Sequence, residues 1–163
     1  MNRSIFLVVA ILIANIGALF AQDSYNHVRS YTPILEVEDA DSLVQLDGAA
    51  VQSLTHYYDG LGRPVQVVTR QGSPAGLDVV QYLEYDSYGR ERFGYLPYVS
   101  DTAVSGFFKS GAKQEQETFY EDPPSFIPAD DHPWAETGFE ASPLSRVIRS
   151  GAPGSLEQPR RPA

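Results

Sequence analysis

The chain has 163 residues, and its 12 Lys and Arg side chains stand against 21 Asp and Glu side chains, so the formal net charge is −9 at pH 7. This acidic balance argues against binding to nucleic acid or to an anionic membrane surface, because both require clusters of Lys and Arg. The sequence contains no Cys, which excludes disulfides and thiolate metal sites. The length suits one domain, stabilised by packing, partners or cations.

The first 21 residues have the pattern of a secretory signal peptide. Arg3 supplies a positive charge, residues 5–20 are mostly apolar, and Ala21 is a small residue before a cleavage point at Gln22. The apolar stretch is shorter than the roughly 20 residues that a spanning helix needs, and no basic cluster follows it. We therefore expect residues 1–21 to be removed, leaving a secreted or cell-surface protein without a stable membrane span. An uncleaved membrane anchor is the alternative.

Residues 22–50 are expected to be a polar lead-in with one strand, at residues 31–37. An acidic run follows at residues 36–41. Its carboxylate oxygens are suitable ligands for calcium, but the run lacks the Asp-x-Asp-x-Asp-Gly form of a specific calcium loop. A solvated acidic edge is therefore the favoured interpretation.

Residues 51–150 are expected to be a β domain built around a pattern that occurs twice, at residues 55–63 and 82–90. The identical positions are Tyr58, Asp59, Gly62 and Arg63 in the first copy and Tyr85, Asp86, Gly89 and Arg90 in the second. A fixed period in the twenties is typical of repeat architectures, in which each unit buries its apolar face against its neighbours. The pattern therefore favours a scaffold over a catalyst.

Each copy predicts a β-hairpin. Asp at the first turn position and Gly at the fourth suit a type I turn followed by a left-handed residue, which gives a three-residue loop with a bulge. The Asp side chain can accept hydrogen bonds from backbone amides two residues further on. The Tyr before the turn and the Arg after it would lie close enough across the same hairpin for a cation–π contact of roughly 0.5–1 kcal/mol.

The pattern Tyr-Asp-x-x-Gly-Arg resembles the repeat of the YD-repeat (RHS-repeat) family. Tyr31-Thr32-Pro33, Leu96-Pro97-Tyr98 and residues 139–147 extend the resemblance, in the same order, to the uncharacterised N-terminal domain of large secreted bacterial YD-repeat proteins. It covers about residues 25–154. The resemblance implies a non-enzymatic domain that begins a shell, and such a shell encloses or displays a C-terminal toxin- or adhesin-type module. The partners it implies are downstream YD repeats of the same or an adjacent polypeptide.

Phe139, Glu140 and Arg146 are similar to a degenerate third unit, which is two residues longer and lacks the Gly. The longer spacing leaves open whether this unit turns in the same way. Two or three units are too few to close a shell, so an open sheet edge is expected, and such an edge favours self-association.

The remaining elements follow from local composition. A short helix is expected at residues 114–120, irregular structure at the Pro-rich residues 121–135, and a final strand at residues 143–149. Residues 151–163 have no apolar pattern and are expected to be a disordered tail at a truncation point. The predicted fold class is mainly β, an antiparallel meander of hairpins with long Pro-rich loops and one short helix.

No pattern in the sequence specifies a catalytic, metal or cofactor site, and we expect none. Asp130, Asp131 and His132 are ligand-type side chains, but adjacent residues rarely point at one centre, and a metal site needs three or four ligands. His56 lies on an expected strand between Leu54 and Tyr58, where a packing role is favoured over ligation.

Two rival functions remain open at this stage. The first is an extracellular carbohydrate-binding module that uses exposed Tyr side chains and Trp134. The second, weaker rival is a secreted hydrolase, with a pair of carboxylates flanking a cleft. The candidate carboxylates are those of Asp130, Asp131, Glu136 and Glu140.

Overall fold

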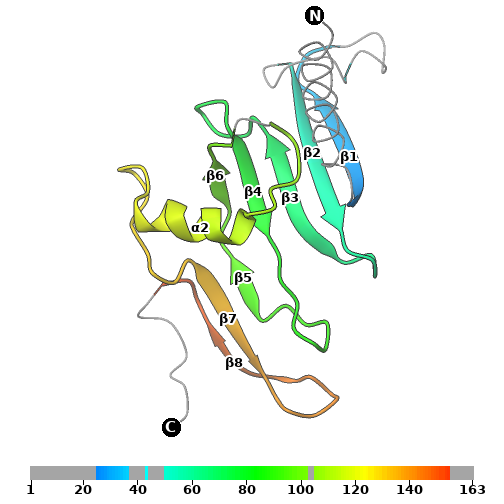
Figure 1. Cartoon of the computed structure of the whole chain (residues 1–163), viewed down its shortest axis with the longest axis vertical. Helices are drawn as coiled ribbons and strands as arrows, with labels where there is room; N and C mark the ends of the chain where they lie inside the picture. The colour runs from blue at the N-terminus through cyan, green and yellow to red at the C-terminus, as the bar shows by residue number, and fades with distance from the viewer. Residues whose placement is uncertain (1–24, 37–42, 44–49, 103–104, 155–163) are drawn as a thin grey trace, which may run out of the picture.

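The structure is a computed structural model that describes residues 25–36, 43, 50–102 and 105–154 (Figure 1). In chain order its elements are β1 (Asn26–Pro33), β2 (Val51–Tyr58), β3 (Pro64–Arg70), β4 (Asp78–Tyr82), β5 (Phe93–Tyr95), β6 (Tyr98–Ser100), α2 (Ala112–Glu121), β7 (Trp134–Phe139) and β8 (Val147–Gly151). All strand pairs are antiparallel. The predicted mainly β class with one short helix is confirmed.

The first sheet has five strands in the order β1-β2-β3-β4-β6. β1 pairs with β2 along its whole length, from Asn26 opposite Tyr58 to Pro33 opposite Val51. The strand of the lead-in thus lies earlier than the expected residues 31–37, because pairing with β2 sets its position. The lead-in strand and the first repeat therefore belong to one sheet.

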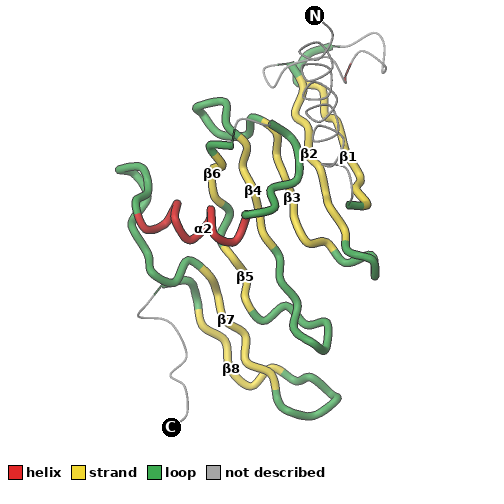
Figure 2. The backbone as a smooth tube through the Cα atoms, viewed as in Figure 1, coloured by secondary structure: helices red, strands yellow, loops and turns green. Residues whose placement is uncertain are grey.

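The second sheet has three strands in the order β5-β7-β8. The second hairpin opens beyond its turn, because β4 stays in the first sheet while β5 pairs with β7 in the second. The turns between β2 and β3, β4 and β5, and β7 and β8 follow one another along the same side of the molecule (Figure 2). The three predicted units are therefore neighbours in space as well as in sequence.

One face of the first sheet is buried beneath α2 and the segment before it (Figure 1). The core cluster consists of Tyr57, Val68, Val80, Tyr98, Ala112 and Tyr120. On β2 the buried residues alternate, and they are Val51, Ser53, Thr55 and Tyr57. The side chains of a strand alternate between its two faces. The opposite face of β2 is therefore occupied by Leu54, His56 and Tyr58.

Polar side chains of the sheet hold the segment at residues 105–111 in place. Gln66 on β3 donates Nε2–H to the Lys109 carbonyl at 2.9 Å, and its Oε1 accepts the Lys109 amide at 2.8 Å. Asp78 on β4 accepts hydrogen bonds from Ser105 Oγ at 2.7 Å and from the Gly106 amide at 2.6 Å. The segment therefore lies on the sheet through a set of paired polar groups.

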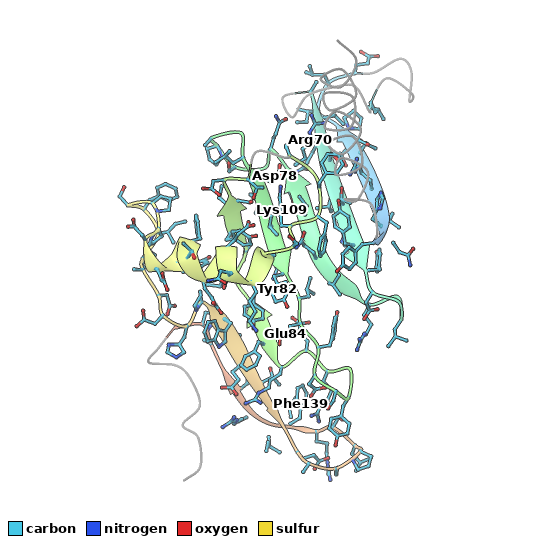
Figure 3. The ribbon with its side chains drawn as sticks, in the orientation of Figure 1. Arg70, Asp78, Tyr82, Glu84, Lys109 and Phe139 are labelled. Atoms are coloured by element: carbon cyan, nitrogen blue, oxygen red, sulfur yellow. The ribbon has the colours of Figure 1, made fainter. Side chains whose placement is uncertain are left out.

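A buried ion pair joins the same two parts of the fold. Lys109 Nζ lies 3.1 Å from Asp78 Oδ2, and both side chains are only 2% exposed (Figure 3). Burial acts to raise the pKa of Asp78, but hydrogen bonds from Ser105 and from backbone amides, together with Lys109, outweigh it and leave the pKa below its usual value. Asp78 is therefore ionised opposite the lysine.

Most other boundaries agree with the sequence to within a few residues. The expected helix at 114–120 is α2, which begins two residues earlier, at Ala112. The Pro-rich stretch is irregular only as far as residue 133, because β7 begins at Trp134 and pairs on both sides. The final strand begins at Val147 rather than at residue 143 and continues to Gly151, the first residue of the expected tail.

Several expectations concern parts of the chain outside the described residues. They are the signal peptide at residues 1–21, most of the acidic run at residues 36–41, and the tail from residue 155 onward. Among the helices that the structure describes, none is long and apolar enough to cross a membrane.

Candidate functional site

The first turn is organised by the side chain of Asp59. Its Oδ1 accepts hydrogen bonds from the amides of Leu61 and Arg63, both at 2.9 Å. Its Oδ2 accepts Arg63 Nε at 2.8 Å and lies 2.7 Å from Arg63 Nη2. One carboxylate thus shapes the turn and also holds the arginine side chain by its edge.

The second turn repeats this geometry. Asp86 Oδ1 accepts the amides of Tyr88 at 2.9 Å and Arg90 at 3.0 Å, and Oδ2 lies 2.8 Å from Arg90 Nε and 2.7 Å from Nη2. Gly62 and Gly89 have φ angles of +78° and +77°. These are the left-handed positions that the sequence predicts for both glycines.

The hydrogen bonds lower the pKa of both turn carboxyl groups. For Asp59 the largest cause is the backbone amide of Arg63, and for Asp86 it is the side chain of Arg90. Both carboxylates are therefore ionised at neutral pH, and each is fully occupied within its own turn.

Each arginine stacks on the aromatic residue of the next repeat, and Arg90 also lies 4.8 Å from the ring centroid of Tyr88 in its own turn. Arg63 Cζ lies 4.6 Å from the ring centroid of Tyr85, and Arg90 Cζ lies 4.6 Å from that of Phe139. The predicted cation–π contact between the Tyr and the Arg of the same copy is therefore wrong, because the partners of these arginines are other rings. The reason is that the Asp holds the edge of the guanidinium inside the turn, so its flat face is directed at the neighbouring hairpin.

We call this series the turn ladder. It consists of Asp59, Arg63, Tyr85, Asp86, Arg90 and Phe139, and each Arg with the aromatic residue of the following unit makes one step. Tyr58, the aromatic residue of the first unit, lies outside the ladder, because no guanidinium lies over its ring in the part of the chain that the structure describes.

A backbone hydrogen bond accompanies each step. In the first step the carbonyl of Val65 accepts a hydrogen bond from the amide of Leu83 at 3.1 Å. Val65 lies two residues after the ladder arginine, and Leu83 lies two residues before the aromatic residue. In the second step Arg92 and Thr137 hold the same two positions, and the distance is 2.8 Å. The contact between units is therefore repeated in its main chain as well as in its side chains.

The third unit also forms a turn, but two residues replace the single aspartate of the first two turns. Glu140 Oε1 accepts Arg146 Nε at 3.0 Å, and Ser142 Oγ accepts the Leu144 amide at 3.2 Å. Ser145 takes the place of the glycine, with a φ angle of +51°. The two extra residues thus allow Glu140 to hold the arginine while Ser142 caps the turn.

Exposure separates the three arginines. The side chains of Arg63 and Arg90 are 33% and 21% exposed, whereas that of Arg146 is 71% exposed. Among the described residues no aromatic ring lies over Arg146. The ladder therefore has a covered part and an uncovered last position.

Two surface hollows adjoin the two steps. The larger has a volume of about 590 Å³ and includes Asp59, Arg63 and Tyr85 in its wall. The smaller, of about 450 Å³, includes the equivalent residues of the next step. Three more rings, those of Tyr25, Tyr82 and Phe108, line only the larger hollow, which makes it the more aromatic of the two.

The residues considered for metal binding do not assemble into a site. Asp130 Oδ1 accepts the amide of His132 at 2.8 Å and so shapes the local loop. In the described parts of the chain no three His, Asp or Glu side chains lie close enough together to hold a metal ion. The ring of His56 lies 6.4 Å from that of Tyr58 on the same strand.

The residues considered for hydrolysis or sugar stacking are also engaged in the fold. Glu136 Oε1 lies 2.7 Å from Arg92 Nη2 and 3.1 Å from Arg149 Nη2. The ring of Trp134 packs against those of Phe93, Tyr95 and His132, with centroids 5.3 to 6.3 Å apart. Both side chains therefore have structural contacts in the second sheet.

One protein family matches residues 29–160, and its description is Domain of unknown function (DUF6443). The chain belongs to this family. The DUF6443 match contains every residue of the turn ladder together with the third turn, so the ladder lies inside the domain. No curated protein and no solved structure matches the chain.

Proposed function

We propose that this DUF6443 chain is the non-enzymatic structural domain that begins a secreted YD-repeat protein, and that the turn ladder joins each repeat to the next. One observation carries the proposal. In both steps a guanidinium is pinned by the aspartate of its own turn and stacked at 4.6 Å on the aromatic residue of the following unit.

The chemistry of the ladder supports coupling rather than catalysis. Its carboxylates are hydrogen-bonded to backbone amides and arginines, and its rings are covered by guanidinium groups. A cation–π contact contributes about 0.5–1 kcal/mol at an exposed site, and more when it is partly desolvated. Repeated at each unit, together with a backbone hydrogen bond, such contacts act as nearest-neighbour interactions in a repeat array.

The test has a genetic and a biophysical part. The DNA downstream of the coding sequence is read for further Tyr-Asp-x-x-Gly-Arg units in any frame. Residues 22–163 are then compared, by light scattering and thermal melting, with the same residues extended by several downstream repeats. We expect the shorter protein to self-associate and to melt at lower temperature, because each added neighbour contributes an interface. A monodisperse, cooperatively melting short form with no repeats downstream would contradict the proposal.

The larger hollow favours a second candidate function, the binding of cell-surface glycan. Rings such as those of Tyr25 and Phe108, which stack with centroids 4.0 Å apart, offer apolar faces to sugar rings. Saturable binding to a polysaccharide array that is lost in Tyr25→Ala, but kept in Arg146→Ala, would support this function. The absence of binding to any glycan on the array would remove it.

A further inference from the structure

The uncovered end of the ladder has the same groups that hold the two existing steps. We propose that a fourth hairpin of the Tyr-Asp-x-x-Gly-Arg type docks on β8. Its aromatic ring lies over Arg146, and the amide two residues before that ring donates to the carbonyl of Ile148. The inference rests on the proposed function and specifies the surface through which the next repeat binds.

Arg146 is positioned as the two ladder arginines are. A carboxylate of its own turn accepts its Nε–H, here Glu140 at 3.0 Å, as Asp59 and Asp86 do at 2.8 Å. Its side chain is nevertheless 71% exposed, whereas Arg90, which lies over the ring of Phe139 in the following unit and over Tyr88 in its own turn, is 21% exposed. The guanidinium of Arg146 is thus oriented for stacking, and no aromatic ring among the described residues covers its face.

The backbone of the third hairpin reproduces that of the first. In the pairing of β2 with β3 a bulge skips Val65, and in the pairing of β7 with β8 a bulge skips Ile148. Each skipped residue follows the turn arginine by two positions. Because the carbonyl of Val65 accepts the amide of the next unit at 3.1 Å, the carbonyl of Ile148 has the equivalent role at β8.

The surroundings of Ile148 fit an added strand. β8 is an outer strand of the second sheet, and the side chains of Val147 and Ile148 are both exposed. The exposure of Leu144 does not indicate a docking surface, because Leu61 and Tyr88 are similarly exposed at the same turn position. In both existing steps the following unit pairs antiparallel, so the new strand is expected to run antiparallel to β8.

The chain can supply its own probe. A second copy of residues 76–97, which contain the second hairpin, is fused after residue 163 of the whole chain. The link, residues 152–163, is longer than the one that joins β3 to β4, residues 71–77. Amide hydrogen exchange is then measured at the copied Leu83, whose amide is the predicted donor to Ile148.

We expect the copied Leu83 amide to exchange at least about tenfold more slowly in the fusion than in the same fusion with the copied Tyr85→Ala. Arg146→Lys, which keeps the charge but removes the planar face, should also speed this exchange. Arg92→Lys, a matched change at an exposed arginine whose side chain lies outside the ladder, should not. Equal exchange in the fusion and in its Tyr85→Ala form would overturn the inference.

A second measurement tests the register of the docked hairpin by disulfide trapping. The chain has no Cys, so one pair can be introduced. Val67 lies opposite Gln81 in the first step, and the equivalent pair at the proposed interface is Ser150 with the copied Gln81. Oxidation should join Ser150→Cys to the copied Gln81→Cys several times faster than to a copied Val80→Cys, whose side chain points to the other face. Equal rates for the two pairs would also overturn the inference.

The two proposals can fail separately. Fast exchange in the fusion, with further repeats present downstream of the gene, would overturn the docking geometry and leave the structural function standing. A gene without downstream repeats would remove the proposed function, while the docking result stays readable because the probe comes from this chain.

Discussion

The first two turns and the third all hold an arginine beside a carboxylate, but they use different residues to do so. In the first two, one aspartate caps the turn and holds the arginine, and a glycine takes the left-handed position. In the third, Glu140 holds the arginine, Ser142 caps the turn, and Ser145 is left-handed. All three turns have an arginine fixed by a carboxylate. The first and third hairpins also have a bulge at the same position.

The position of the arginine beside a carboxylate is the same in all three units, whereas the turn itself varies. The turns differ in length and in sequence, yet each places its guanidinium beside a carboxylate. The environments then differ, since Arg63 and Arg90 are stacked on the following unit, whereas no ring among the described residues lies over Arg146. Variants at equivalent positions can therefore separate the contribution of the turn from that of the neighbour.

The largest effect is expected from replacing the turn glycines by Val. A side chain forced into a left-handed conformation costs about 1–3 kcal/mol. A Cβ at Gly89 would lie 3.1 Å from Arg63 Nη1, whereas one at Gly62 would meet no atom within 4 Å. We expect Gly89→Val to lower the free energy of unfolding by about 3 kcal/mol and Gly62→Val by about 1 kcal/mol. Denaturant melts measure both.

The third turn provides the control for the glycine series. Ser145→Gly removes a side chain from a left-handed position and should leave the melting midpoint unchanged or slightly higher. Unchanged midpoints for both Val variants would show that the hairpin assignment is wrong.

The arginines test the neighbour directly. Arg90→Ala removes the stacks on Phe139 and Tyr88 and the partly buried pair with Asp86, and should cost about 1–2 kcal/mol. Arg146→Ala removes an exposed pair, with no ring above it among the described residues, and should cost less than about 0.5 kcal/mol. Equal losses in chemical melts of the two variants would mean that stacking on the next unit contributes nothing.

A smaller effect separates the two steps of the ladder. The hydroxyl of Tyr85 donates to the carbonyl of Pro64 at 2.8 Å, a bond that Phe139 cannot make in the second step. Tyr85→Phe should therefore lower the free energy of unfolding by about 1 kcal/mol. Tyr88→Phe, at an exposed ring in the same turn, is the matched control and should change nothing measurable.

The smallest effect concerns acid stability. The pKa values of Asp59, Asp86 and Glu140 are all lowered in the folded protein. Carboxyl groups of this kind add stability that is fully present above their unfolded pKa values, about 3.9 for Asp, and lost as the pH falls through the lower folded values. Asp86→Asn should therefore flatten the fall of the melting temperature below about pH 4.

An NMR titration distinguishes the third turn from the first. The largest cause of the low pKa of Glu140 is the hydrogen bond from the Ser142 hydroxyl. Ser142→Ala should raise the pKa of Glu140 towards its ordinary value and leave that of Asp59 unchanged. An unchanged pKa of Glu140 would show that the hydrogen bond from Ser142 does not stabilise the ionised carboxylate.

The sequence is sufficient for the local structure of the ladder. Asp and Gly at fixed turn positions predict both hairpins and both left-handed glycines, because those requirements act within a few residues. The partner of each arginine could not be predicted in the same way. Whether Arg63 meets Tyr58 or Tyr85 depends on how two hairpins lie side by side, and that is decided by pairing between β3 and β4.

Buried polar residues account for most of what the sequence did not predict. Gln66 and Lys109 belong to residue types that are mostly exposed in folded proteins, yet both are buried, and they fix residues 105–111 over the first sheet. Their partners are 43 and 31 positions away in the chain, so no local pattern reveals them. The separation of β4 from β5 into different sheets is likewise decided by distant strands, β6 and β7.

The anchoring of residues 105–111 has a consequence for the order of folding. Each hairpin can form from neighbouring residues, on the scale of microseconds. The cover of the first sheet, however, is joined to it by pairs such as Gln66 with Lys109 and Tyr57 with Gly106, which are distant in sequence and therefore slow to meet. Until α2 has been synthesised and has docked, Tyr57, Val68 and Val80 stay in contact with water. In this interval the exposed apolar side chains make the chain prone to aggregation.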